Sequence, residues 1–137
     1  MGAWDTTSFG NDTACDWLAE LIDSGSSDMI ADAFDSVISA DGDFIESSTG
    51  EEAVAAAEVL AWLQGRPGPS SDATEGLDDW MEEQEEEEYE RLLKKGRKTL
   101  DIVAGDQSEL KEIWEESGEL EDWAKSIADL KVRLRES

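Results

Sequence analysis

The chain has 137 residues, a formal net charge of −25 and an apolar fraction of 39%. Its length fits one domain, and its six tryptophans exclude an acidic disordered protein, which would lack large apolar residues. The excess negative charge repels nucleic acid and anionic membranes over at least a Debye length of about 8 Å, so cations and cationic proteins are the remaining partners.

Apolar residues recur every three or four positions along the chain, and β-branched alternation is absent. This spacing is typical of helices, so we expect an all-α fold. The first helix begins at Asn11 or Asp12, both good N-cap residues, and ends near Gly25. Its inner face consists of Ala14, Trp17, Leu18, Leu21 and Ile22.

A second helix begins at Ser26 or Ser27 and ends at Gly42. After it, Phe44 and Ile45 form an extended connector that we expect to be buried. The apolar face of this helix consists of Ile30, Phe34, Val37 and Ile38.

The third predicted helix starts with a capping box, formed either by Ser48 and Glu51 or by Thr49 and Glu52. Gly65 ends this helix, because glycine adopts the backbone conformation that closes a helix. Its alanines suit close packing against other helices. The apolar positions are Ala53, Val54, Ala56, Ala57, Leu60, Ala61 and Leu63.

Residues 65–71, with the sequence GRPGPSS, form the clearest loop, because Pro67 and Pro69 cannot continue a helix. Each flank of this loop is too short to bury a core by itself. We therefore expect residues 1–137 to form a single helical domain, in which an acidic segment at residues 72–90 follows the loop.

Helical spacing resumes after the loop and continues through the acidic segment, as one long helix or as two joined helices. Asp106 and Glu109 can cap a short helix that ends at Gly118. With the last helix, the chain is predicted to form a compact bundle of about six helices. The apolar positions of these helices are Leu77, Trp80, Met81, Tyr89, Leu92, Leu93, Leu100, Val103, Leu110, Ile113, Trp114, Leu120, Trp123, Ile127, Leu130 and Leu134.

The N-terminal sequence MGAWDTTSFGNDTACDWL resembles a bacterial domain-of-unknown-function family with the signature M-G-x-W-G, F-x-N-D and A-x-D-W, although Asp5 replaces the glycine. FIESSTGEEAVAAAEVLAWLQGRPG and SELKEIWEESGELEDWAKSIADLKVRL are similar to its middle and C-terminal segments. The resemblance implies a compact bacterial protein and no known reaction. From the residues themselves, Trp4 and Phe9 are expected to pin the N-terminal segment to the bundle, in preference to forming an exposed recognition patch.

Catalytic chemistry has little support in the sequence. Histidine is absent, which excludes histidine-dependent nucleophiles and nearly every catalytic zinc site. Cys15 precedes Asp16, whose carboxylate disfavours a thiolate, so a packed thiol is favoured over a nucleophile. Among 36 acidic residues, no pair is specific enough to indicate a glycosidase. We therefore expect neither an enzyme nor a cofactor.

A calcium loop is the main metal hypothesis. Asp41, Asp43 and Glu52 occupy positions 1, 3 and 12 of an EF-hand pattern. However, Ile45 stands at a ligand position and Glu46 stands where glycine must turn the chain. We expect weak cation binding by surface carboxylates but no dedicated metal site.

A cytoplasmic location is the default for this composition. A single cysteine cannot form an internal disulfide, so nothing indicates an oxidising compartment. No stretch approaches the roughly 18 apolar residues of a membrane span, and the N-terminus lacks the basic and apolar regions of a signal peptide.

The charge is unevenly distributed along the chain. Residues 1–65 carry −14 and no Lys or Arg, residues 66–90 carry −10, residues 91–104 carry +4, and residues 105–137 carry −5. Seven glutamates fall within WMEEQEEEEYE, residues 80–90. Helical glutamates give about one charge per 1.5 to 2 Å, and duplex DNA carries one per about 1.7 Å, which makes nucleic-acid mimicry physically possible.

Two interpretations of this acidic segment stay open. Successive glutamates point all round a helix and not along one face, which favours a solvated run, whereas their charge density favours a partner-binding surface. In the second case the binding residues would be Asp78, Asp79, Glu82, Glu83, Glu85, Glu86, Glu87 and Glu88.

The basic residues at 91–98 have a simpler explanation than nucleic-acid binding. Arg91 can pair with Glu87 or Glu88, and Lys94 can pair with Glu90, at helical neighbour positions. Internal neutralisation of the acidic segment is therefore favoured over a nucleic-acid site.

Together these features predict a non-catalytic acidic binding protein, such as an inhibitor or immunity-type protein or a nucleic-acid mimic. Its partner would be a basic protein, for example a nuclease, a toxin or a nucleic-acid-binding protein, with no direct nucleic-acid or membrane ligand. The alternative is a regulatory or scaffold protein whose acidity is an adaptation to high salt, with no charge-specific partner.

Overall fold

The computed structural model describes residues 12–40, 43–66, 74–85, 89–105 and 107–134. Within these ranges the chain contains seven helices and no strand. The all-α prediction is confirmed, whereas the expected number of about six helices is too low. The reason is that the acidic segment contains a short helix of its own, α4 (Leu77–Glu82), which ends well before the next described helix begins at Leu93.

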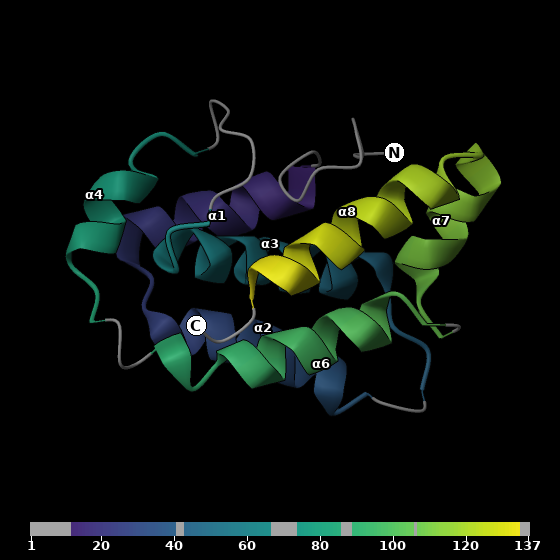
Figure 1. The fold of residues 1–137 in the computed structure, drawn as a ribbon, viewed down its shortest axis with the longest axis horizontal. Coiled ribbons are helices and arrows are strands. Elements are labelled where there is room, and N and C mark those ends of the chain that lie inside the picture. The colour runs from purple at the N-terminus through teal and green to yellow at the C-terminus, as the bar shows by residue number, and fades with distance from the viewer. Residues whose placement is uncertain (1–11, 41–42, 67–73, 86–88, 106, 135–137) are drawn as a thin grey trace.

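The helix α3 (Ser47–Leu63) lies at the centre of the molecule and is buried on every side along most of its length, with Glu58 as its one buried charged residue. Residues 53–62 are all buried, so every side of the helix is covered over nearly three turns. The α3 helix packs against five others, which surround it (Figure 1). These are α1 (Asp12–Ser24), α2 (Ser27–Ile38), α6 (Leu93–Val103), α7 (Glu109–Ser117) and α8 (Leu120–Arg133).

The arrangement of the outer helices gives the molecule two distinct ends. Figure 1 shows α8 crossing in front of α3, with α1 on one side and α2 and α6 on the other. The α4 helix lies at one end of the long axis and α7 at the opposite end. The two ends can therefore be compared as separate surfaces.

Most helix ends follow their local sequence signals. The hydroxyl of Ser26 accepts a hydrogen bond from Asp28 N, 3.3 Å away, and so caps α2. Gly65 and Gly118 adopt positive φ angles of 75° and 83° just after α3 and α7, as helix-ending glycines do. These three predictions from the sequence are confirmed.

The start of α3 differs from the prediction. Neither expected capping box forms, because the helix begins at Ser47 and Glu46 is its N-cap residue. The backbone N–H of Ser47 instead donates to Glu109 Oε1, 2.8 Å away, at the start of α7. A carboxylate at a helix N-terminus satisfies an unpaired donor and interacts favourably with the helix dipole.

A short parallel bridge brings Glu109 to that position. Ile45 N donates to the carbonyl of Gln107 at 2.8 Å, and Glu109 N donates to the carbonyl of Ile45 at 2.9 Å. Ser108, the central residue of this bridge, is buried and caps α7 by accepting from Lys111 N. The connectors before α3 and before α7 are therefore joined.

Of the two residues predicted to be buried in the connector between α2 and α3, only one is buried. Ile45 is 2% exposed, but Phe44 is 50% exposed. Adjacent residues of an extended segment point to opposite sides, so burial of Ile45 turns Phe44 outward. The prediction of a buried Phe44 is wrong.

Candidate binding surface

The short helix α4 is attached to the bundle through its apolar face. Leu77 and Trp80 are buried, and the indole N–H of Trp80 donates to the carbonyl of Gly25 at 3.2 Å, just after α1. Gly76 precedes α4 with a φ of 84°, and a Cβ at this position would lie 3.2 Å from Ile22 of α1. Glycine thus permits both the turn and the close approach to α1.

The turn that follows α4 is fixed by hydrogen bonds. Gln84 Nε2 donates to the carbonyl of Trp80 at 3.0 Å, and the Tyr89 hydroxyl donates to Gln84 Oε1. The rings of Trp80 and Tyr89 are edge to face, with centroids 6.2 Å apart. Both polar ends of Gln84 are therefore engaged, and its side chain is held in place.

The outer side of this anchored helix is acidic. Among the described residues, no Lys or Arg forms an ion pair with the exposed carboxylates of α4 and the turn after it. We call this set the acidic α4 surface. It consists of Asp78, Asp79, Glu82, Glu83 and Glu85.

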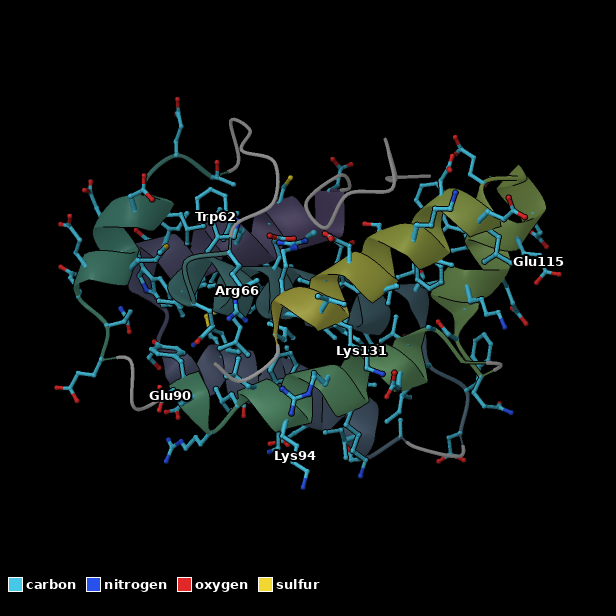
Figure 2. All side chains as sticks on the ribbon, in the orientation of Figure 1. Trp62, Arg66, Glu90, Lys94, Glu115 and Lys131 are labelled. Atoms are coloured by element: carbon cyan, nitrogen blue, oxygen red, sulfur yellow. The ribbon has the colours of Figure 1, made fainter. Side chains whose placement is uncertain are left out.

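The structure places these five predicted partner-binding residues in one stretch at one end of the molecule (Figure 1). The other three predicted site residues, Glu86, Glu87 and Glu88, lie outside the described residues. Acidic side chains are also exposed at the α7 end, where Figure 2 labels Glu115. This second group provides an internal comparison for the first.

A cavity adjoins the acidic α4 surface and was not predicted from the sequence. It is a largely open depression with a volume of about 530 Å³, and Asp78 and Glu82 are among its lining residues. The other lining residues are Leu63, Met81 and Gln84. Leu63 of α3 and the residues of α4 are far apart in the chain, so no local signal could have identified this shared lining.

The end of α3 near this cavity carries an unsatisfied polar group. Trp62 precedes Leu63 and is 9% exposed, yet its indole N–H finds no hydrogen-bond acceptor in the described structure. Figure 2 shows Trp62 towards the α4 end of the molecule.

The predicted neutralisation of the acidic segment by residues 91–98 does not occur where it can be tested. No ion pair joins Glu90 to Lys94 in the described structure, and Glu87 and Glu88 lie outside it. Instead, Lys95 Nζ lies 2.6 Å from Asp35 Oδ1 and connects α6 to α2. The predicted pair of Glu90 with Lys94 is therefore wrong, whereas the pairs of Arg91 with Glu87 or Glu88 stay predictions.

The most deeply buried charge belongs to Glu58, in the middle of α3. Its side chain is 3% exposed and forms a two-point ion pair with Arg133 of α8, at 2.6 Å and 2.9 Å. Arg133 Nε also lies 3.0 Å from Asp129 Oδ2. Burial lowers the pKa of Arg133, but the interactions with Glu58 and Asp129 outweigh burial and raise that pKa above its usual value.

The same region fixes the end of α8. Arg66 Nη1 donates to the carbonyl of Arg133 at 3.3 Å, and Arg133 Nη1 donates to the carbonyl of Arg66 at 3.2 Å. Arg97 Nη1 donates to the carbonyl of Leu134 at 2.8 Å. These contacts connect α3, α6 and α8, which indicates a structural role for the cluster. One signal for this cluster is visible in the sequence, namely an acidic residue, Glu58, inside an apolar helix.

Two glutamates at the start of α3 face the acidic side of α1. Burial, and then the nearby charge of Asp12, raises the pKa of Glu51. Burial, and then the charge of Glu20, raises the pKa of Glu52. Residues 1–65 contain no Lys or Arg, so no cation of this part of the chain offsets the repulsion.

Other chemical features of the described residues are limited. They contain no group of three or more Cys, Asp or Glu side chains placed to hold a metal ion. None of their helices combines the length and apolar character that crossing a bilayer requires. Cys15 is half-buried, and the predicted clasp residues Trp4 and Phe9 lie outside the described ranges.

Comparison with known proteins identifies a family without a known activity. The family model described as Domain of unknown function (DUF4259) matches residues 2–126. The chain therefore belongs to this family, which confirms the broad resemblance found in the sequence. No curated protein and no solved structure matches the chain significantly.

Proposed function

We propose that this member of the DUF4259 family is a non-catalytic binding protein whose acidic α4 surface occupies a basic surface of a protein partner. One observation carries the proposal: five exposed carboxylates are clustered on and just after one short helix, and no described cation forms an ion pair with them. Charge left unpaired on a surface is available to a cationic partner.

The attachment of α4 supports this role. Hydrogen bonds from Trp80 and Gln84 hold the helix and the following turn against the bundle. A binding element that is already ordered loses less conformational entropy when it binds, and this favours affinity. The strong negative potential would also accelerate association with a basic partner and make the rate sensitive to salt.

An inhibitor or immunity-type protein fits this geometry better than an extended nucleic-acid mimic. The helix α4 has six residues and is therefore about 9 Å long. Such a length matches only a few phosphates of a nucleic-acid strand. The expected partner is a basic protein such as a nuclease, a toxin or a nucleic-acid-binding protein, whose basic site the acidic α4 surface would cover.

The experiment that tests this proposal compares the two ends of the molecule. One variant, D78N/D79N/E82Q/E83Q, removes four charges from α4, and its control, E112Q/E115Q/E116Q/E119Q, removes four exposed charges from and beside α7. Both variants and the wild-type chain are used to capture proteins from a cell extract at about 0.1 M and about 1 M salt, because salt screens exposed charges.

We expect a basic protein to be captured at low salt by the wild-type chain and by the α7 control, and to be lost with the α4 variant. High salt should also abolish capture, because screening weakens interactions between exposed charges. Equal capture by both variants, or capture that does not depend on salt, contradicts the proposal.

A second candidate is a regulatory or scaffold protein whose acidity is an adaptation to high salt. It is favoured by the exposed acidic side chains that α1, α2 and α7 carry in addition to α4. Under this hypothesis, the chain should unfold near 0.1 M salt and refold at molar salt, as followed by circular dichroism. A fold that is equally stable at both salt concentrations removes this candidate.

We also propose that the chain comes from a bacterium and is located in the cytoplasm. The N-terminal signature supports a bacterial protein, and the single cysteine supports a reducing compartment such as the cytoplasm. Measurement of the thiol state of Cys15 in cells tests the second point, because an oxidising compartment would convert it to a mixed or intermolecular disulfide.

A further inference from the structure

We propose that the cavity beside α4 is a pocket for an arginine side chain from a basic segment of the partner. This inference rests on the proposed function and specifies which chemical group the acidic α4 surface recognises. Three properties of the cavity support it: two carboxylates on one side, an apolar portion, and a polar side chain that is already held in place.

The two carboxylates are suitably placed for one cationic group. Asp78 and Glu82 are four residues apart on α4, so they project from the same side of the helix, and both line the cavity. Neither is in ion-pair contact with a described cation. Two like charges this close repel each other, and a cation placed between them relieves that repulsion.

The apolar portion of the cavity suits the stem of a long cationic side chain. Leu63 and Met81 are half-buried and line the cavity together with the carboxylates. Arginine and lysine bury their methylene groups along apolar surfaces while their charged ends reach polar groups. Methionine also adapts its shape to such a stem because it is unbranched.

Arginine fits this set of groups better than lysine. A guanidinium has five donors in a planar arrangement, which can reach two carboxylates at once, and it is more weakly hydrated than an ammonium group. The cavity volume of about 530 Å³ lies within the usual range for ligand sites, about 300 to 1,000 Å³, so residues that flank the arginine can also enter.

The pocket is open to this ligand without rearrangement of Gln84. Its amide donates to the Trp80 carbonyl, and its oxygen accepts from the Tyr89 hydroxyl, so this lining residue is fixed. Because Trp80 also binds the Gly25 carbonyl, a ligand in the pocket would be sensed by the indole N–H of Trp80. That proton gives an indirect spectroscopic signal of occupancy, through the hydrogen bond from Gln84 to the Trp80 carbonyl, whereas Met81 lines the cavity itself.

The test uses three capped peptides that differ only in one central residue: arginine, lysine or citrulline, the neutral analogue of arginine. Each is titrated into the full chain while the indole N–H signals and the methionine methyl signals are followed by NMR. We expect saturable shifts at Trp80 and Met81 with the arginine peptide, affinity weaker by about threefold or more with lysine, and no saturable shift with citrulline, because charge-assisted hydrogen bonds are lost.

Matched variants separate the pocket from the general charge of α4. D78N/E82Q changes the two acidic residues that line the cavity, whereas D79N/E83Q removes two charges, from α4 and from the residue just after it, that do not line the cavity. We expect the first pair to weaken binding of the arginine peptide by about tenfold or more, and the second pair to change it by no more than about twofold. Equal effects of the two pairs overturn the pocket.

Three further outcomes also overturn it: equal affinity for the lysine peptide, the same shifts on adding Ca²⁺ alone, and shifts that depend on protein concentration because a second copy docks through its exposed Arg91 or Lys94. The pocket and the proposed function can fail separately. If capture of the partner requires the acidic α4 surface but D78N/E82Q and D79N/E83Q reduce capture equally, the proposed function is supported and the pocket is not. If the arginine peptide binds but no basic protein is captured, the pocket stands without the function.

Discussion

Carboxylates at the interface between α3, α6 and α8 are paired with cations, whereas the described carboxylates at the α4 end of the molecule are not. At the interface, Arg133 pairs with Glu58 and Lys131 pairs with Asp101, so that cations connect helices. At the α4 end, five carboxylates are exposed, and no described cation pairs with them. The negative surface at α4 therefore results from where the few cations lie as much as from where the acids lie.

This difference shows how a chain with 36 acidic and 11 basic residues can fold without neutralising its surface. The cation of α8 is used where a buried carboxylate would otherwise be costly, because an unpaired buried charge is strongly destabilising. Exposed carboxylates on α4 are hydrated and need no partner for the fold to be stable. They are thus available for another protein.

The largest expected effect comes from breaking the buried pair. The variant R133M leaves the carboxylate of Glu58 buried without its partner, so the free energy of unfolding should fall by about 3 to 5 kcal/mol. The double variant E58L/R133M should recover much of this loss, because both charges are replaced by apolar groups. Urea unfolding followed by tryptophan fluorescence measures both values.

The matched control is K131M, which removes a cation from an exposed ion pair of the same helix. The side chains of Lys131 and Asp101 are 44% and 59% exposed, so the loss should stay below about 1 kcal/mol. If R133M lowers the free energy of unfolding no more than K131M does, then burial does not make the Arg133–Glu58 pair more important for stability than the Lys131–Asp101 pair.

An intermediate effect is expected at the attachment of α4. The variant W80F removes the hydrogen bond to the Gly25 carbonyl and part of the buried ring, which should cost about 1 to 2 kcal/mol. Amide hydrogen exchange should become faster in α4 while α3 stays protected. A uniform increase in exchange across both helices would show that α4 is an integral part of the core, contrary to this interpretation.

The smallest expected effect concerns pH. The pKa values of Glu51 and Glu52 are raised in the folded chain, so the fold binds their protons more tightly than the unfolded chain does. Their ionised forms therefore oppose folding at neutral pH, and this cost disappears as the pH falls through the raised pKa values towards the ordinary glutamate pKa of 4.5.

The variant E51Q/E52Q should accordingly be more stable than the wild-type chain at pH 7, and the difference should shrink as the pH falls towards the ordinary glutamate pKa of 4.5. Urea unfolding at several pH values measures this difference. The control E115Q/E116Q removes two exposed charges at the α7 end and reports the effect of net charge alone. An equal gain in both variants would assign the effect to net charge.

Those parts of the fold that depend on neighbouring residues could be predicted from the sequence. Ser26 marks the start of α2, and Gly65 and Gly118 mark helix ends, because each acts through its own backbone or the next turn. The inner faces of α1 and α8 follow from the spacing of their apolar residues, which the structure buries.

The features that were missed depend on residues far apart in the chain. Glu109 caps α3 from 62 residues away, and Arg133 reaches Glu58 from 75 residues away. The cavity exists only because Leu63 of α3 meets α4. At the site itself, the sequence identified the acidic residues Asp78 and Glu82 but not the apolar wall beside them, since tertiary packing creates that wall.

The bridge between Ile45 and Ser108 has a consequence for how this family can vary in length. Because one stretch of backbone sets the first turn of α7 and also supplies the carboxylate that starts α3, neither connector can gain or lose a residue independently. A one-residue insertion after Gln107 would shift Glu109 out of reach and loosen two helices that are distant in the chain. Natural insertions and deletions should therefore accumulate in other loops, whose backbone makes no hydrogen bonds to another segment.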